Sequence, residues 1–285
     1  MKTKLIVLGI IIFNIIACTD RSEIPIPSYI YIDSIDLKTS PSQGTNSHAF
    51  RDAWIYVNDT FVGAYELPVK VPVVNFGEAR VKIYAGIRED GIISHPVRYS
   101  MTSPYVSNLY LDAGKIDTIE PIVEYYSDIK FPFIENFDKT HFFNQDIDGN
   151  VLTQVTLSTL ADAFEGSNSG EIHLTKENPA LVAWYDYSKA IPTGPNEVFL
   201  ELDYKCDVRF SVGFIGFKAG ETPKDLIFGT LHPKEYWNKV YFNFTQTLID
   251  CGCENYRIGI YAVYDTSIAK VNQVIHLDNF KVLYR

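Results

Sequence analysis

Short apolar runs separated by turn residues recur along most of the chain, and no long segment keeps the spacing of an amphipathic helix. Aromatic and β-branched residues dominate these runs, and both residue classes favour strands. Prolines, glycines and Asn/Asp turn signals interrupt the runs about every 8–12 residues, which is the spacing typical of β-sandwiches. The pattern therefore predicts an all-β protein.

Residues 29–126 form the first predicted β domain. The strand 53–57 leads into Asn58-Asp59 and a second strand at 61–65, which predicts a tight hairpin. The order of turn and strand residues resembles a PEGA-type small β domain and the N-terminal domain of Bacteroidota lipoproteins. The resemblance rests on Val57, Asn58, Val62, Gly63, Pro68, Pro72, Gly77, Val81 and Ile83. It implies a small β-sandwich-like fold and no particular chemistry, because glycines and prolines shape turns.

A strip rich in acidic, aromatic and proline residues between Glu120 and Phe133 separates two differently patterned halves, and residues 127–133 are predicted to be a linker. Strand patterns then recur through 134–285. The opening Glu135-Asn136-Phe137-Asp138, a Trp237-x-x-Val240-x-Phe242 strand and the closing strand 275–282 resemble the jelly rolls of carbohydrate-binding modules and galactose-binding-like domains. The resemblance implies a jelly-roll β-sandwich, a fold that serves lectins, receptors and enzymes alike.

The first 17 residues predict a signal peptide. Lys2 and Lys4 precede an apolar run at 5–16, which is too short to cross a bilayer and ends in Ala17 and Cys18. The tetrad Ile15–Cys18 resembles a lipobox, which implies lipidation of Cys18 by diacylglycerol and a further acyl chain such as palmitate. Residues 18–28 are then a tether at the outer membrane. Both a periplasmic and a surface-facing position agree with the sequence. An ordinary signal peptide with a chance cysteine is the alternative.

The net charge limits the classes of partner, and the number of cysteines limits how they can pair. Without residues 1–17 the chain keeps 35 acidic and 23 basic residues (25 less Lys2 and Lys4), a net charge of −12, which argues against nucleic acid. Beyond Cys18 there are three cysteines, an odd number that cannot all pair. A disulfide from Cys206 to Cys251 or Cys253, or buried thiols, is favoured over a metal or redox site because no C-x-x-C is present.

No catalytic motif is recognisable: the sequence contains no G-x-S-x-G, H-E-x-x-H or phosphate loop. Glu171 and Glu201 would form a glycosidase pair only if the fold brought them together. The sequence therefore predicts a non-enzymatic protein, with a surface polysaccharide hydrolase as the rival interpretation.

The segment Ala183-Trp184-Tyr185-Asp186-Tyr187 is the best candidate for ligand binding, because sugar faces stack on exposed rings. Trp184, Tyr185 and Tyr187 are the predicted contacts, and core packing of these rings is the alternative. Strand alternation places Tyr185 on one face and Trp184 with Asp186 on the other.

The jelly-roll resemblance also implies a structural Ca²⁺ near the opening and closing strands, with Asp138, Glu171 and Asp278 as the candidate ligands. In the closing strand, Ile275, Leu277 and Asn279 alternate with His276, Asp278 and Phe280, so one face is expected to join the core while Asp278 points the other way or into a bend. Together, these sequence features predict a membrane-anchored protein that binds a glycan or an envelope protein through its jelly roll. A structural component of a surface or secretion assembly is the alternative.

Overall fold

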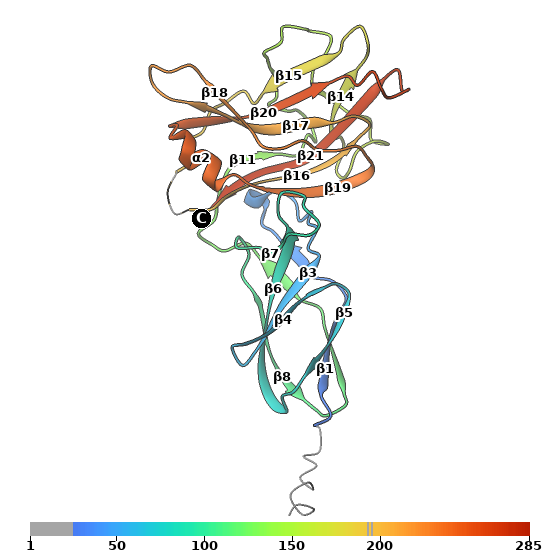
Figure 1. Ribbon diagram of the computed structural model, residues 1–285, viewed down its shortest axis with the longest axis vertical. Coiled ribbons are helices and arrows are strands. Elements are labelled where there is room, and N and C mark those ends of the chain that lie inside the picture. Colours follow the sequence, from blue (N-terminus) through green and yellow to red (C-terminus); the bar gives the residue numbers. More distant parts are fainter. Residues whose placement is uncertain (1–24, 193, 195) are drawn as a thin grey trace, which may run out of the picture.

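A computed structural model describes residues 25–192, 194 and 196–285 (Figure 1). The predicted signal peptide, Cys18 and most of the tether lie outside the described residues. Among the described residues strands dominate, and the helical elements there are one 3-10 turn, η1 (Pro41–Gln43), and one short helix, α2 (Thr245–Cys251). The all-β prediction is confirmed. Within the described part of the chain, no helix has the length and apolar character that a membrane crossing requires.

The first module contains ten strands in three small sheets. The hairpin predicted around Asn58-Asp59 is present, since both residues adopt the positive φ angles (49° and 63°) of a two-residue turn. The sheets have the orders β5-β1-β9, β10-β2 and β4-β3-β6-β7, with β8 also paired to β6. The strands are β1 (Ser28–Ile32), β2 (Asp36–Lys38), β3 (Asp52–Val57), β4 (Thr60–Glu66), β5 (Val69–Val73), β6 (Gly77–Arg88), β7 (Pro96–Arg98), β8 (Tyr105–Leu111), β9 (Ile116–Ile119) and β10 (Ile122–Glu124).

The second module is a two-layer antiparallel sandwich. Its sheets have the orders β13-β14-β21-β16-β19, with β11 also on β21, and β12-β15-β20-β17-β18. From β14 to β21 this is the strand order of a jelly roll. The strands are β11 (Lys130–Glu135), β12 (Gln145–Asp146), β13 (Thr156–Leu157), β14 (Gly170–Leu174), β15 (Ala180–Trp184), β16 (Val198–Cys206), β17 (Phe210–Phe217), β18 (Lys224–Ile227), β19 (Lys234–Asn243), β20 (Asn255–Val263) and β21 (Gln273–Tyr284).

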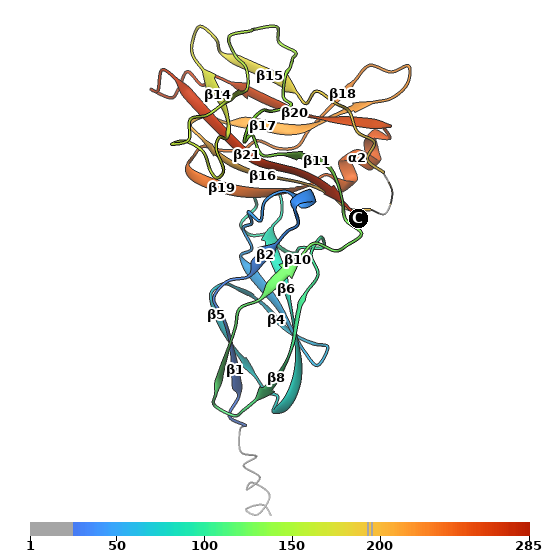
Figure 2. The ribbon, with the colours of Figure 1, turned by 180° about the vertical axis from the view of Figure 1, so that it is seen from behind.

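The two modules stack end to end, as both views show (Figures 1 and 2). The upper end of the first module packs against the sheet that contains β16, β19 and β21, which we call the junction sheet. Phe199, Tyr241 and Leu283 project from that sheet into the apolar core of the first module. The other sheet, β12-β15-β20-β17-β18, packs on the inner face of the junction sheet, so its outer face points away from the first module. We call it the free sheet.

Buried charges accompany the apolar contact at the junction. The Lys239 Nζ atom lies 3.5 Å from Glu201 and 3.3 Å from Asp203, and all three side chains are at most 3% exposed. From the first module, the Tyr125 hydroxyl donates to Glu201 at 3.1 Å and the Ser47 hydroxyl donates to Asp203 at 2.6 Å. Buried charges are tolerated only when they are paired and hydrogen-bonded, so this network needs groups from both modules.

The predicted linker at 127–133 needs correction in its second half. Strand β11 begins at Lys130 and pairs with β21, and Phe133 is buried in the core of the second module. Tyr125 and Ile129, which precede β11 in the same strip, belong to the core of the first module. The aromatic residues that made the strip look like a boundary are there because the two cores meet at it.

Candidate functional site

The outer face of the free sheet is the broad sheet surface that the first module leaves uncovered. One row of paired residues crosses all five strands in the order Gln145, Trp184, Gly259, Gly213 and Ile227. Neighbouring outward positions on the same face carry Arg257, Phe217, Tyr261 and Asp225. The rings and the guanidinium are half-buried, while Gln145 and Asp225 are exposed.

An aromatic and cationic cluster occupies one side of this row. The rings of Trp184 and Phe217 meet edge to face, with centroids 6.1 Å apart. The Arg257 guanidinium lies 5.6 Å from the centroid of the Phe217 ring. Such stacking holds an arginine side chain in one orientation, which leaves its donors arranged for a partner. The cluster thus combines an indole with a guanidinium group.

Tyr261 occupies the other side of the row. Its hydroxyl donates to the Asp225 carboxylate at 2.8 Å, and its ring comes within 2.9 Å of the position that a Cβ on Gly259 would take. The missing side chain of Gly259 therefore lets the ring lie against the sheet. Burial, followed by the hydrogen bond to Asp225, raises the pKa of Tyr261, so this hydroxyl stays protonated and remains a donor at neutral pH.

The structure separates the three aromatic residues that the sequence proposed as ligand contacts. Trp184 lies on the outer face of the free sheet. Tyr185 points into the core, where its ring packs 5.2 Å from Phe133 and 5.3 Å from Phe143, so it cannot touch a ligand. Tyr187 is 58% exposed but lies beyond the end of β15, beside Phe142. Sequence reasoning missed Phe217, Arg257, Tyr261 and Asp225, which come from three other strands.

A second concave region lies where the modules meet, with a volume of about 650 Å³. Arg51 and Arg88 line it from the first module, and Tyr204 and Tyr236 line it from the second. This volume is in the range of ligand pockets. Arg88 is paired there with Asp52. No sequence signal pointed to this cleft, because its walls come from segments far apart in the chain.

The three proposed calcium ligands do not converge on one site in the structure. Asp138 accepts the Ser167 backbone N–H at 2.9 Å, while Asp278 is fully buried and accepts the Ser169 hydroxyl at 2.6 Å. The Glu171 carboxylate lies between His173 and His276, at 2.5 and 3.6 Å. No group of three or more His, Cys, Asp or Glu side chains suited to a metal occurs among the residues described. The geometry gives this calcium set no support.

The glycosidase pair considered from the sequence is not formed either. Glu171 is on β14 and Glu201 on β16, with β21 between them in the sheet. Glu201 is fully buried at the junction, where it accepts hydrogen bonds from tyrosine side chains. A substrate that reached Glu171 would not reach Glu201.

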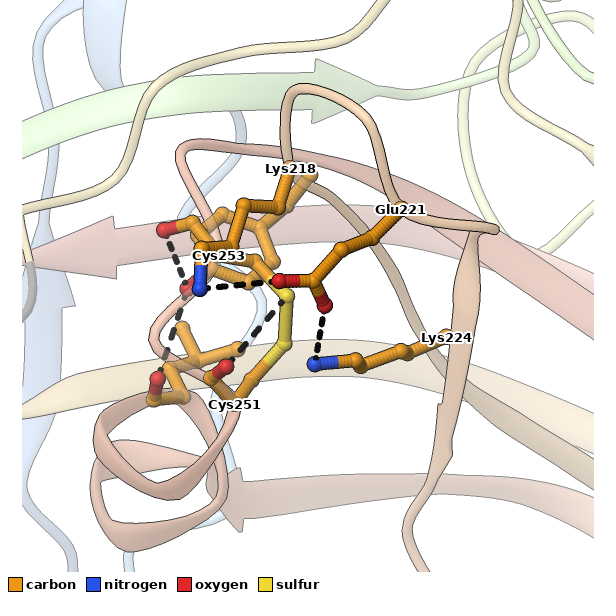
Figure 3. The surroundings of a disulfide bond; sticks show 7 residues. Lys218, Glu221, Lys224, Cys251 and Cys253 are labelled. Atoms are coloured by element: carbon orange, nitrogen blue, oxygen red, sulfur yellow. Dashed lines mark hydrogen bonds and ion pairs between the residues drawn. A yellow bond between two sulfur atoms is a disulfide. The ribbon is translucent and has the colours of Figure 1, made fainter.

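The cysteine pairing differs from the predicted one. Cys251 and Cys253 form a disulfide with each other at the end of α2 (Figure 3). Cys206 is a free buried thiol. Burial raises the pKa of Cys206 to about 12, so the thiol is not reactive at neutral pH. Glu221 lies beside the disulfide, between Lys218 and Lys224. Cys206 is on the other sheet from the Cys251–Cys253 turn, so only the close pair bonds.

No family model matches the chain, and no curated protein matches it significantly. Similar solved structures include a family 30 carbohydrate-binding module from a Clostridium thermocellum cellulosomal cellulase, at 12% identity and TM-score 0.41, covering 54% of this chain and 96% of that one. Another is a carbohydrate-binding module of the β-sandwich superfamily with promiscuous specificity, at 11% and 0.37, covering 82% and 85%.

The enzymatically active domain of a bacteriophage CBA120 tailspike is also similar, at 11% identity and TM-score 0.36, over 46% of this chain. The chain spans 17% of that tailspike chain and 28% of a Clostridium thermocellum xylanase chain that it also matches. Such low identities and TM-scores say nothing about which ligand this chain binds.

Proposed function

We propose that this protein is an envelope lipoprotein, anchored through Cys18, that binds a glycan on the outer face of the free sheet and does not cleave it. The observation that supports the proposal is the single surface formed by Trp184, Arg257, Tyr261 and Asp225. An indole offers a flat apolar face to a sugar ring, while guanidinium and carboxylate groups bind hydroxyls in pairs. The four residues come from three strands of one sheet, β15, β18 and β20, which favours a preorganised site.

The placement of this face suits an anchored binding protein. The described chain starts at the end of the first module that is far from the sandwich (Figure 1). The free sheet therefore faces away from the predicted anchor, toward whatever lies beyond the membrane. The net charge of −12 without the signal peptide disfavours strongly acidic polysaccharides, so a neutral glycan is the proposed ligand.

Two rival functions make different demands on the structure. A structural component of a surface or secretion assembly would use the same face, or the cleft at the junction, for a protein. A polysaccharide hydrolase would need an accessible carboxylate pair, and Glu171 with Glu201 does not provide one.

A glycan array followed by calorimetry tests the proposal. For a neutral glycan that binds, Trp184→Ala should weaken affinity at least about tenfold, since central aromatic contacts dominate such interfaces. Trp237→Ala is the matched control, because Trp237 is also half-buried but lies on the junction sheet. Loss of binding in Tyr236→Ala instead would move the site to the cleft. No glycan signal together with a stably captured protein would favour the assembly, and released sugar products would favour the hydrolase.

The anchor has its own test. Cys18→Ala should leave the precursor unprocessed by lipoprotein signal peptidase and remove the protein from the membrane fraction, and globomycin should reproduce the processing defect. Normal removal of residues 1–17 from the variant, with retention in membranes, would show that the anchor is not on Cys18.

A further inference from the structure

Three segments meet at the end of the first module where the described chain begins. They are residues 25–28, the turn 73–77 and the turn 112–116. Hydrogen bonds join them: the Gly114 N–H donates to the Pro27 carbonyl at 2.9 Å, and the Ser28 hydroxyl donates to the Val73 carbonyl at 3.0 Å. Figure 1 shows this end at the bottom of the molecule, opposite the sandwich. The turns are therefore fixed in place rather than loose.

Large apolar side chains project from this end. Their exposed fractions run from 49% to 67%, although apolar side chains of this size normally bury most of their surface. They are Ile26, Val74, Phe76, Tyr110 and Ile116, and we call them the apolar tip. In the three segments the only charged residues are Asp112 and Lys115, which neutralise each other in an ion pair of 2.6 Å. Outside these segments, the exposed Glu78 lies opposite Tyr110 across β6 and β8. A predominantly apolar cluster with so few charges marks an interaction surface.

We propose that the apolar tip rests in the interfacial layer of the lipid bilayer. The inference rests on the proposed anchor at Cys18. Six residues lie between Cys18 and Pro25, so the seven residue steps from one to the other span at most about 25 Å. The tip is thus held next to the bilayer at a high effective concentration, so even a weak apolar contact persists. Aromatic rings with a polar end, such as Tyr110, suit this layer.

This contact would orient the whole molecule. A flexible tether alone permits every orientation of the body above the membrane. A tip seated in the interface holds the long axis of Figure 1 upright, which presents the free sheet away from the lipid. The tip is therefore a positioning element for the proposed glycan site.

Fluorescence on vesicles tests the contact in the full lipidated protein. Val74→Trp places an indole in the tip, and Val151→Trp is the matched control, because Val74 and Val151 are 64% and 71% exposed but lie in different modules. On phosphatidylethanolamine vesicles that contain brominated lipid, the Val74→Trp indole should lose fluorescence and the Val151→Trp indole should not. Adding Ile116→Asp should reverse the loss, whereas Ile122→Asp should not, although Ile116 and Ile122 are 54% and 53% exposed.

The outcomes separate the contact from the anchor. Protein that floats with vesicles and carries acyl mass on Cys18, but shows no quenching of the Val74→Trp indole, overturns the contact and leaves the anchor intact. Protein that neither floats nor carries acyl mass overturns both. A blue-shifted but unquenched indole, with a doubled mass in detergent, would assign the tip to a second copy of the chain and overturn the lipid contact.

Discussion

The two sheets of the sandwich carry similar kinds of residues on their outer faces but use them differently. On the junction sheet, Phe199, Glu201 and Lys239 are buried because the first module covers them. On the free sheet, Trp184, Arg257 and Asp225 keep contact with solvent because nothing covers that face among the described residues. Aromatic and charged outward positions therefore become either a domain interface or a binding surface, depending on what packs against the sheet.

This difference between the two sheets predicts which property a substitution changes on each of them. On the junction sheet they should change stability, since the charges there lack water and depend on one another. On the free sheet they should change binding and leave stability nearly unaltered, since solvent screens and solvates the groups.

The largest effect is expected for Lys239→Ala. Removal of the ammonium leaves Glu201 and Asp203 buried without their shared cation, and breaking a buried charge group in this way costs about 3–5 kcal/mol. Urea unfolding at pH 7 measures the loss. Lys224→Ala, which breaks an exposed ion pair with Glu221 on the free sheet, is the control and should leave the midpoint unchanged. Equal midpoints for both variants would contradict the buried network.

A pH-dependent effect is expected at Asp278, on β21 of the junction sheet. Burial, partly offset by hydrogen bonds from Ser169 and the Asn279 N–H, raises the pKa of Asp278 to about 7. Between about pH 4 and 7 the unfolded chain has lost this proton and the folded protein keeps it. Stability therefore falls as pH rises, by at most about 1.4 kcal/mol per pH unit from this group.

Asp278→Asn removes that dependence. Relative to the variant, the wild-type protein should become less stable from pH 4.5 to 7, and the difference should then stay constant. Denaturation of both proteins at several pH values, with and without EDTA, measures it. Stabilisation of the wild type by calcium, absent in the variant, would instead favour the metal site expected from the sequence.

The smallest effect on stability is expected for Gly259→Ala on the free sheet. The new methyl group would meet the Ile215 side chain at 2.5 Å and the Tyr261 ring at 2.9 Å. Small side-chain shifts relieve these contacts, and alanine lowers the entropy of the unfolded chain, so unfolding should change by about 1 kcal/mol or less. The same shift displaces the Tyr261 ring and its hydroxyl from their positions beside Asp225, so glycan affinity should fall. Unchanged affinity would place the ligand away from this ring.

In the closing strand, β21, residue alternation predicts some side-chain directions correctly and one wrongly. Alternation correctly put Ile275 and Leu277 in the core and turned Asp278 away from it. It then predicted that Phe280 would point outward, yet Phe280 is fully buried in the core. Asn279 adopts a positive φ of 49°, and the pairing with β16 shifts register there, so one extra residue reverses the alternation. A bulge of this kind leaves no clear mark in the sequence.

The all-β class, the early hairpin and the strand pattern of the sandwich can be predicted from the sequence, because strand propensity, alternation and turn residues act over a few neighbouring positions. It also located Trp184 correctly on the opposite strand face from Tyr185. Three further features became known from the folded arrangement: Cys251 bonds to Cys253, Glu201 is buried against another module, and Trp184 shares a surface with Arg257 and Tyr261. Those outcomes depend on which sheet face is covered and on pairing between distant strands, and such long-range packing is not encoded in any single stretch of chain.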